Sequence, residues 1–98
     1  MASPRNQTLR LTRSDRTRLV PESIPARPQP DHVYHGDALE GLRRLRKGSI
    51  SLIIADPPYE TGKGPRRARY LEWTEKWISL AVRSLRPGGT IYVCSPWE

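Results

Sequence analysis

Apolar and polar positions follow two different periods along the last two thirds of the chain. Short apolar runs at 32–35, 49–55 and 90–94 have the length of strands. The run 49–55 is β-branched and nearly continuous, which is typical of a strand buried on both faces of a parallel sheet. Apolar residues recur at three- and four-residue steps over 38–47 and 68–85, which predicts amphipathic helices. The order predicts an α/β fold in which about three strands alternate with two helices.

The first thirty residues have a different composition from the rest. Prolines at 21, 25, 28 and 30 interrupt any regular element, and arginines alternate with polar residues. We therefore expect an irregular basic arm over 1–30, followed by one small domain over 31–98. The arginines of the arm suit contact with a DNA backbone, and a solvated tail explains them equally well.

Composition limits the class of protein further. With 98 residues, 36% hydrophobic residues and a net charge of +7, the chain has room for one small domain with a thin core and a basic surface. The excess of arginine over lysine suits phosphate contact, because guanidinium pairs bidentately with phosphate oxygens. A basic surface without a partner is the open alternative. The N-terminus lacks an apolar signal core, no run is long enough to span a bilayer, and one cysteine excludes an internal disulfide framework, so we expect a cytoplasmic protein.

Three polar turns follow the three expected strands, at Gly36-Asp37, at 56–59 and at 95–97. The carboxyl ends of parallel strands meet at one edge of a sheet, and ligands bind outside that edge in open α/β sheets. The three turns should therefore gather around a single site.

The turn Asp56-Pro57-Pro58-Tyr59 carries the most informative chemistry. Asp56 is an acceptor only, and two prolines without N–H groups leave carbonyl acceptors in a stiff segment. Tyr59 adds a flat aromatic face. An exocyclic amine of a base could donate its two N–H groups to Asp56 and to the Pro57 carbonyl, and its lone pair could then attack a sulfonium methyl group. A strand-ending turn with an incidental Asp and Tyr is the alternative, but four such residues directly after an apolar strand rarely arise by chance.

Residues 53–59 resemble the signature of the N6-adenine and N4-cytosine DNA methyltransferases. Residues 35–40, 70–73 and 85–93 are similar to the segments around that signature in the group where it comes early in the chain. The likeness covers roughly the whole chain, most firmly 32–95.

The resemblance implies a Rossmann-like methyltransferase fold in circularly permuted motif order, with 31–98 as part of the catalytic domain. It implies S-adenosyl-L-methionine as methyl donor and double-stranded DNA as substrate. It assigns Asp56, Pro57, Pro58 and Tyr59 to the target amine and base. It also places Asp37 near the cofactor, whereas the residues alone leave a helix N-cap equally open.

A basic loop follows the signature. Its cations are Lys63, Arg66, Arg67 and Arg69. They could grip phosphates near a flipped base, or they could be a solvated loop. The two histidines have no Cys or His partners at ligand spacing, so no metal site is expected.

The sequence departs from the family in two respects. The glycine-rich cofactor loop that the permuted group carries near its C-terminal end does not occur here, and neither does a target-recognition region. We therefore expect a truncated gene, a split subunit or a partial record, inactive alone and completed by a C-terminal half or a downstream subunit. An RNA or protein amide methyltransferase fragment and a basic nucleic-acid-binding remnant without catalysis are the alternatives. Motif order favours DNA, and adenine and cytosine both remain open as the target.

Overall fold

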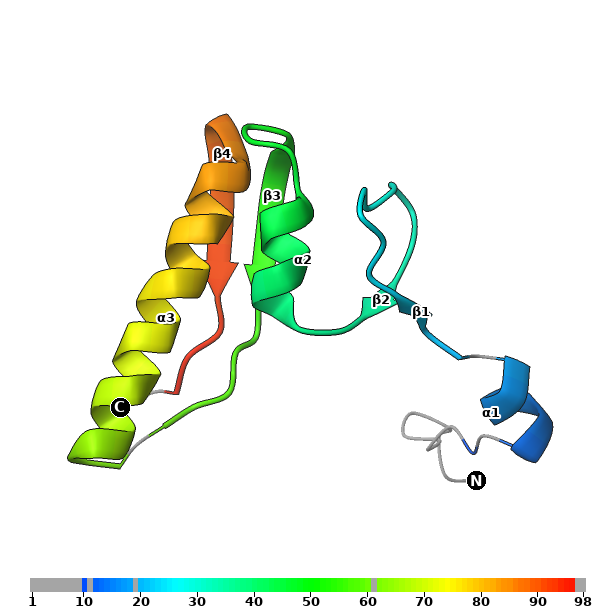
Figure 1. Cartoon of the computed structure of the whole chain (residues 1–98), viewed down its shortest axis with the longest axis horizontal. Helices are drawn as coiled ribbons and strands as arrows, with labels where there is room; N and C mark the ends of the chain where they lie inside the picture. The colour runs from blue at the N-terminus through cyan, green and yellow to red at the C-terminus, as the bar shows by residue number, and fades with distance from the viewer. Residues whose placement is uncertain (1–9, 11, 19, 61, 97–98) are drawn as a thin grey trace, which may run out of the picture.

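The computed structural model describes residues 10, 12–18, 20–60 and 62–96. The elements that follow the arm are β2 (Tyr34–His35), α2 (Ala38–Arg44), β3 (Ile50–Ala55), α3 (Pro65–Ser84) and β4 (Leu85–Val93). Strands and helices alternate along the chain, as Figure 1 shows. The expected α/β class, with three strands alternating with two helices in this part, is confirmed.

β3 and β4 pair in parallel and leave the sheet at the same edge. Ile53 lies opposite Ile91, and Ala55 lies opposite Val93. The ladder continues one step further, because the Cys94 N–H donates to the Ala55 carbonyl at 2.8 Å. The turns that follow the two strands therefore start side by side.

The helices begin and end at slightly different residues from those that the pattern predicts. α2 stops at Arg44 because Leu45 is extended, with φ −73° and ψ 139°. α3 starts at Pro65, three residues before the expected start, and proline suits the first helical position because its fixed φ is already helical. The register of β3 and β4 is irregular between Ile50 and Leu52, where Pro87 and the two glycines after it enter β4.

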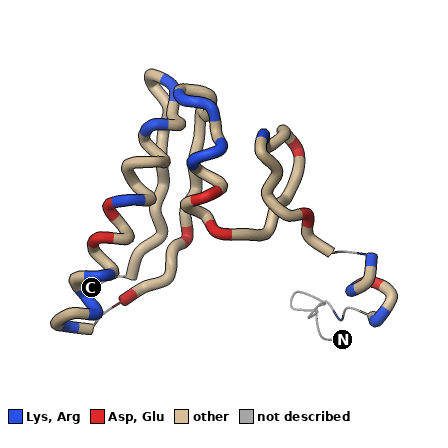
Figure 2. The backbone as a smooth tube through the Cα atoms, in the orientation of Figure 1, with Lys and Arg blue, Asp and Glu red and all other residues tan. Residues whose placement is uncertain are grey.

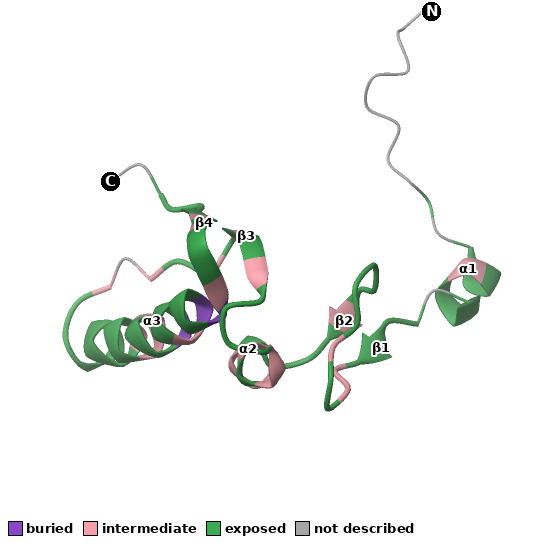
Figure 3. Ribbon diagram, turned by 90° about the horizontal axis from the view of Figure 1, so that it is seen from above, coloured by how far each residue is buried: buried purple, intermediate pink, exposed green. Residues whose placement is uncertain are grey.

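The expectation that the strand 49–55 is buried on both faces is wrong for the described structure. Both helices lie on one face of the β3/β4 pair (Figure 3). On the other face, Ile54 is 72% exposed and its neighbour Tyr92 is 63% exposed. The core sits between the helices and the covered face, where Trp77 and Ala81 are buried. An apolar run indicates that both faces of a strand can be buried, but it does not indicate which of those faces the described residues cover.

The strands form two separate pairs and not one sheet of three. β2 pairs in parallel with β1 (Glu22–Ser23), so that Glu22 lies opposite Tyr34 and Ser23 lies opposite His35. Within the described residues, β2 therefore belongs to a two-stranded sheet with the arm, and β3 belongs to a second two-stranded sheet with β4. The partner of β2 comes from a segment whose prolines predict an irregular chain.

The described part of the arm is more ordered than expected. It contains β1 and a short helix, α1 (Arg13–Arg18). Thr12 and Asp15 cap this helix reciprocally, since the Thr12 N–H donates to Asp15 Oδ2 at 2.9 Å and the Asp15 N–H donates to Thr12 Oγ1 at 3.1 Å. α1 ends before Pro21, as the helix-breaking effect of proline requires. The division of the chain at residue 30 stays a prediction.

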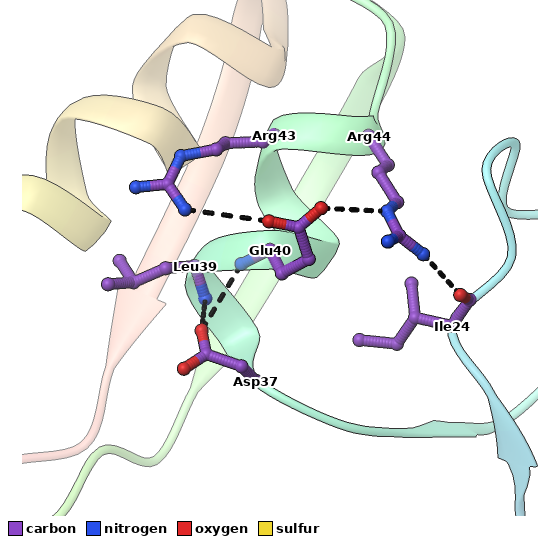
Figure 4. Close-up of polar contacts among 6 residues, drawn as sticks. All are labelled: Ile24, Asp37, Leu39, Glu40, Arg43 and Arg44. Atoms are coloured by element: carbon purple, nitrogen blue, oxygen red, sulfur yellow. Dashed lines mark hydrogen bonds and ion pairs between the residues drawn. The ribbon is translucent and has the colours of Figure 1, made fainter.

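Ile24 of the arm contacts α2 and the segment before it (Figure 4). Its carbonyl oxygen accepts a hydrogen bond from the guanidinium of Arg44, which Glu40 also pairs at 3.0 Å. Its side chain lies against Gly36 and Gly41, where an added Cβ would come within 2.7 Å and 3.3 Å of Ile24 Cδ1. Arg44 is therefore only 33% exposed at its side chain, although the helical pattern places it toward water.

Candidate active site

The turn Asp56–Tyr59 continues directly from β3, at the edge where both strands of the pair end. The Tyr59 hydroxyl donates to Asp56 Oδ1 at 2.9 Å, so the first and last residues of the turn are joined across the two prolines. Asp56 and Pro58 are exposed, Pro57 is half-buried, and Tyr59 is 48% exposed. The turn thus presents a carboxylate and an aromatic ring to the outside while its own backbone stays restrained.

The bond to Asp56 also fixes the protonation state of Tyr59. The hydrogen bond to the Asp56 carboxylate, with smaller contributions from burial and from the negative charge of Asp56, raises the pKa of Tyr59 above its usual value. A tyrosine is already neutral at ordinary pH, and the raised pKa extends to higher pH the range in which Tyr59 acts as a hydrogen-bond donor. It holds the carboxylate in place and keeps its ring uncharged.

Two hollows flank the turn. The smaller one has a volume of about 330 Å³ and lies between the start of α2, the end of β3 and the inner side of α3. It is lined by Ala38, Leu42, Ile53, Ile54, Ala55, Asp56, Pro57, Pro58, Trp73, Trp77 and Ala81. Its walls are mostly apolar, and the first three residues of the turn form one side.

The larger hollow lies on the Tyr59 side of the turn and has a volume of about 540 Å³. It is lined by Tyr59, Glu60, Gly62, Lys63, Arg67, Tyr70, Ser95 and Pro96. Its walls carry two cations, a carboxylate and two tyrosine rings, whereas Asp56 is the one charged residue in the described lining of the smaller hollow. Both hollows have volumes in the range typical of small-molecule and cofactor sites.

Asp37 caps α2, as one of its two expected roles requires. Its Oδ1 atom accepts hydrogen bonds from the N–H groups of Leu39 at 2.8 Å and Glu40 at 3.2 Å (Figure 4). The next residue, Ala38, lines the smaller hollow, so Asp37 stands at its border. The role of Asp37 toward a cofactor stays a prediction.

The structure divides the four cations of the basic loop into two pairs. All four are exposed, but only Lys63 and Arg67 line the larger hollow. All four lie at the start of α3 or directly before it, where basic residues cluster in Figure 2. The sequence gives no sign of this division, because the four residues lie within one short segment.

Sequence reasoning missed three side chains that line the larger hollow. Glu60 and Tyr70 belong to the loop after the turn and to the first half of α3, and Ser95 follows β4. A signal existed for Ser95, since it starts the third polar turn at the expected edge. Tyr70 lies three positions after Arg67, which is one turn of a helix, and its ring centroid is 5.9 Å from the guanidinium carbon of Arg67.

Among the residues with described positions, no group of three His, Cys, Asp or Glu side chains could hold a metal ion. In the same part of the chain, no helix combines the length and the apolar character that crossing a membrane requires. These two findings complete the description of the site and of its surroundings.

Comparison with known proteins agrees with this geometry. A family model described as DNA methylase matches residues 50–97, a stretch that starts at β3 and contains the turn, α3 and β4. Over these residues the chain belongs to the N6/N4 DNA methylase family. The resemblance that the sequence suggests is thereby confirmed, and the larger hollow and the turn both fall inside the DNA methylase segment.

Several methyltransferases are similar to this chain. The type II methyltransferase M.HpaI of Haemophilus parainfluenzae is 39% identical over 64 residues, which cover 58% of this chain and 20% of the relative. The DNA adenine methyltransferase YhdJ of Escherichia coli (strain K12) is 32% identical over 67% of this chain and 25% of its own length. The type II methyltransferase M.BglII of Bacillus subtilis is 30% identical over 86% of this chain and 25% of its own length. The chain therefore spans a quarter or less of the relatives it matches.

Proposed function

We propose that this chain supplies the catalytic turn of a site-specific DNA methyltransferase that methylates the exocyclic amine of adenine or cytosine. The observation that carries the proposal is the turn itself, with Asp56 exposed, Tyr59 bonded to it and a hollow on either side. The names of the similar proteins, all of them methyltransferases and one a DNA adenine methyltransferase, support the substrate class.

The turn can hold an amine by its two N–H groups. One N–H donates to the Asp56 carboxylate and the other donates to the Pro57 carbonyl. Pro57 and Pro58 have no N–H groups, so neither competes with the amine as a donor to that carbonyl. As the amine nitrogen bonds to the methyl carbon, the bond between that carbon and the sulfonium sulfur of the donor breaks and the donor leaves as a neutral thioether. The nitrogen becomes positive, and acceptors that are already in place stabilise that charge. The proton then leaves to Asp56 or to water, and the product is a neutral methylated amine.

The target base must leave the duplex before its amine can reach the turn. Flipping a base costs a few kcal/mol, and stacking on an aromatic side chain returns roughly 1–3 kcal/mol. The half-exposed ring of Tyr59 is the stacking surface that this turn offers. Because Asp56 holds the Tyr59 hydroxyl, the ring and the carboxylate act on one base together.

The methyl donor proposed for this reaction is S-adenosyl-L-methionine, which supplies an electrophilic methyl group. The smaller hollow fits part of such a molecule, because its wall is mostly apolar and includes Ala38, which directly follows Asp37. Trp77 also lines it, and its buried indole Nε1 has no hydrogen-bond partner among the described residues. In this proposal Asp37 accepts hydrogen bonds from the cofactor and the apolar wall excludes water from the reacting amine.

The proposal extends to the basic loop, to DNA as partner and to the cytoplasm as compartment. In this proposal Lys63, Arg66, Arg67 and Arg69 favour the binding of double-stranded DNA through the attraction of their charges to its phosphates. A complementary C-terminal half or downstream subunit provides the remaining parts of the enzyme. Both extensions follow from the family and from the charge of the loop.

A chimaera tests the proposed function. The 64-residue stretch of M.HpaI that aligns with this chain is replaced by the matching residues of this chain. Transfer of labelled methyl groups from S-adenosyl-L-methionine to duplex DNA is then measured. We expect transfer, and we expect Asp56→Ala to reduce it by roughly 100- to 1,000-fold, as the loss of a transition-state hydrogen-bond partner does.

The matched control is Glu75→Ala, which removes an exposed carboxylate on α3 away from both hollows. We expect this variant to keep full transfer. Undiminished transfer by the Asp56→Ala chimaera would refute the proposed role of the turn. Transfer to tRNA and not to DNA would favour the RNA methyltransferase alternative, and DNA binding without any transfer would favour the binding remnant.

A further inference from the structure

The larger hollow carries an excess of positive charge beside the stacking surface. Lys63 and Arg67 contribute two cations to its lining, and Glu60 contributes one carboxylate. Ser95 adds a hydroxyl group from the turn after β4. A ligand that fills this hollow while its base stacks on Tyr59 is expected to carry negative charge.

Arg67 is held in place before any ligand arrives. Its Nη1 group donates to the Glu60 carbonyl, and its guanidinium lies over the Tyr70 ring, with 5.9 Å between the guanidinium carbon and the ring centroid. A guanidinium has five N–H donors, so these two contacts leave several free for a ligand. Because the side chain is already ordered, binding an anion costs little further side-chain entropy.

The carboxylate of Glu60 is restrained in a similar way. Its Oε1 atom accepts a hydrogen bond from the Gly62 N–H at 2.8 Å, and Glu60 is only partly exposed. The loop backbone therefore holds this negative charge at a fixed place in the hollow. Its repulsion limits how tightly an anion binds here, and its removal should strengthen binding.

The start of α3 adds to the same field. The helix is 20 residues long, has no acidic residue in its first turn and has no side-chain cap at Gly64. The positive end of its dipole therefore adds to the charges of Lys63 and Arg67 without a carboxylate to offset it. The helix start therefore also favours an anionic ligand, but the main evidence for such a ligand is the charged lining of the hollow.

We propose that the larger hollow binds a phosphodiester group of the strand that carries the target base, with Arg67 as its main contact and Lys63 as the second. This inference rests on the proposed function, because it takes the base on Tyr59 and the phosphate beside it as parts of one nucleotide chain. It separates the basic loop into two roles. Lys63 and Arg67 position the target strand, and Arg66 and Arg69 contribute only long-range attraction.

The test measures binding of a fluorescein-labelled single-stranded oligonucleotide to the full chain by anisotropy, over a range of sodium chloride concentrations. A single strand presents base and phosphate without the cost of flipping. We expect Arg67→Ala to weaken binding by roughly tenfold, because a hydrogen bond to a charged group is stronger than one between neutral groups. The slope of log affinity against log salt should fall by about 0.7, the value for one phosphate contact in a single strand.

The matched control is Arg66→Ala, which removes the same charge from the adjacent position, outside the hollow. We expect it to weaken binding by less than about threefold, as the loss of an exposed long-range charge does. Arg67→Lys should recover only part of the loss, because lysine keeps the charge but not the planar donors. Glu60→Gln should tighten binding. Equal losses for Arg66→Ala and Arg67→Ala would overturn the proposal, and so would full recovery by lysine.

Two further experiments identify the source of the phosphate and separate this inference from the proposed function. An abasic oligonucleotide keeps the phosphodiesters, so the Arg67→Ala loss should persist while a Tyr59→Ala loss disappears. In the second experiment, millimolar inorganic phosphate is added and compared with sodium chloride at equal ionic strength. If phosphate displaces more oligonucleotide than chloride does, the hollow is a site for free phosphate and the assignment to a phosphodiester of the target strand is overturned. If the Asp56→Ala chimaera keeps methyl transfer while Arg67→Ala alone weakens binding, the proposed function fails and the phosphate site stands.

Discussion

Replacing Gly36 by alanine tests whether Ile24 fastens the arm to the domain. A Cβ atom at position 36 would lie 2.7 Å from Ile24 Cδ1 and 3.0 Å from Ile24 Cγ1. Carbon atoms in ordinary contact are about 3.5–4.0 Å apart, so the side chain of Ile24 must move out by up to about 1 Å. Gly41 leaves little room for that movement, since its own Cβ position is 3.3 Å from the same Cδ1 atom. We expect Gly36→Ala to destabilise the chain by about 1–3 kcal/mol, as overpacking does.

Whether Gly36→Ala lowers or raises the free energy of unfolding depends on whether residue 24 is isoleucine. In an Ile24→Ala chain both crowding atoms are absent, and Gly36 does not have a positive φ. Alanine then reduces the entropy of the unfolded chain without strain, so Gly36→Ala should be neutral or stabilising by about 0.4–1 kcal/mol. Urea denaturation of the wild type, both single variants and the double variant, followed by far-ultraviolet circular dichroism, measures this coupling. If Gly36→Ala lowers the free energy of unfolding equally in both backgrounds, the side chain of Ile24 does not lie against Gly36.

Three further predictions concern the turn and the two helices. Asp56→Asn should lower the pKa of Tyr59 toward its usual value, measured as the part of the phenolate absorbance at 295 nm that Tyr59→Phe removes. Because the pKa of Tyr59 is raised in the folded chain, the stability that this bond contributes is complete below the unfolded pKa of about 10 and is lost as pH rises through the folded pKa. A wild-type titration identical to that of the Asn variant would argue against the bond. Asp37→Ala should cost about 1 kcal/mol in urea denaturation through loss of the α2 cap, whereas Asp37→Asn should cost much less, and equal costs would contradict capping. Gly64→Ala should lower the free energy of unfolding by about 1–3 kcal/mol, because φ 76° and ψ −149° suit glycine alone, and an unchanged thermal midpoint would contradict this conformation.

The sequence allows the fold class and the place of the turn to be predicted, because both depend on local pattern. The apolar run before Asp56 can form only a short strand, and two consecutive prolines must end it. The helical spacing before Leu85 is long enough to cross over to a parallel neighbour. These features need no knowledge of distant contacts, and the structure has them where the pattern places them.

The pairing of β1 with β2 could not be predicted in the same way. Glu22 and Ser23 have no apolar alternation, and prolines flank them. Their pairing depends on Ile24 reaching Gly36 and Gly41, two glycines that otherwise suggest only a turn and a weak helix position. The missed helix α1 is a different case, because the Thr12–Asp15 spacing is a local capping signal and was available from the sequence.

The candidate site depends on β4 as much as on β3, although the recognisable motif follows β3 alone. The Cys94 N–H bonds to the Ala55 carbonyl, so the chain leaves both strands at the same level and Ser95 starts beside Asp56. Ser95 and Pro96 then line the larger hollow together with Lys63 and Arg67. A motif read along the chain identifies Asp56 and Tyr59, and the register of the two strands adds Ser95 and Pro96 to the hollow beside Tyr59. The four cations of the loop are equivalent in the sequence, whereas in the structure only Lys63 and Arg67 line this hollow.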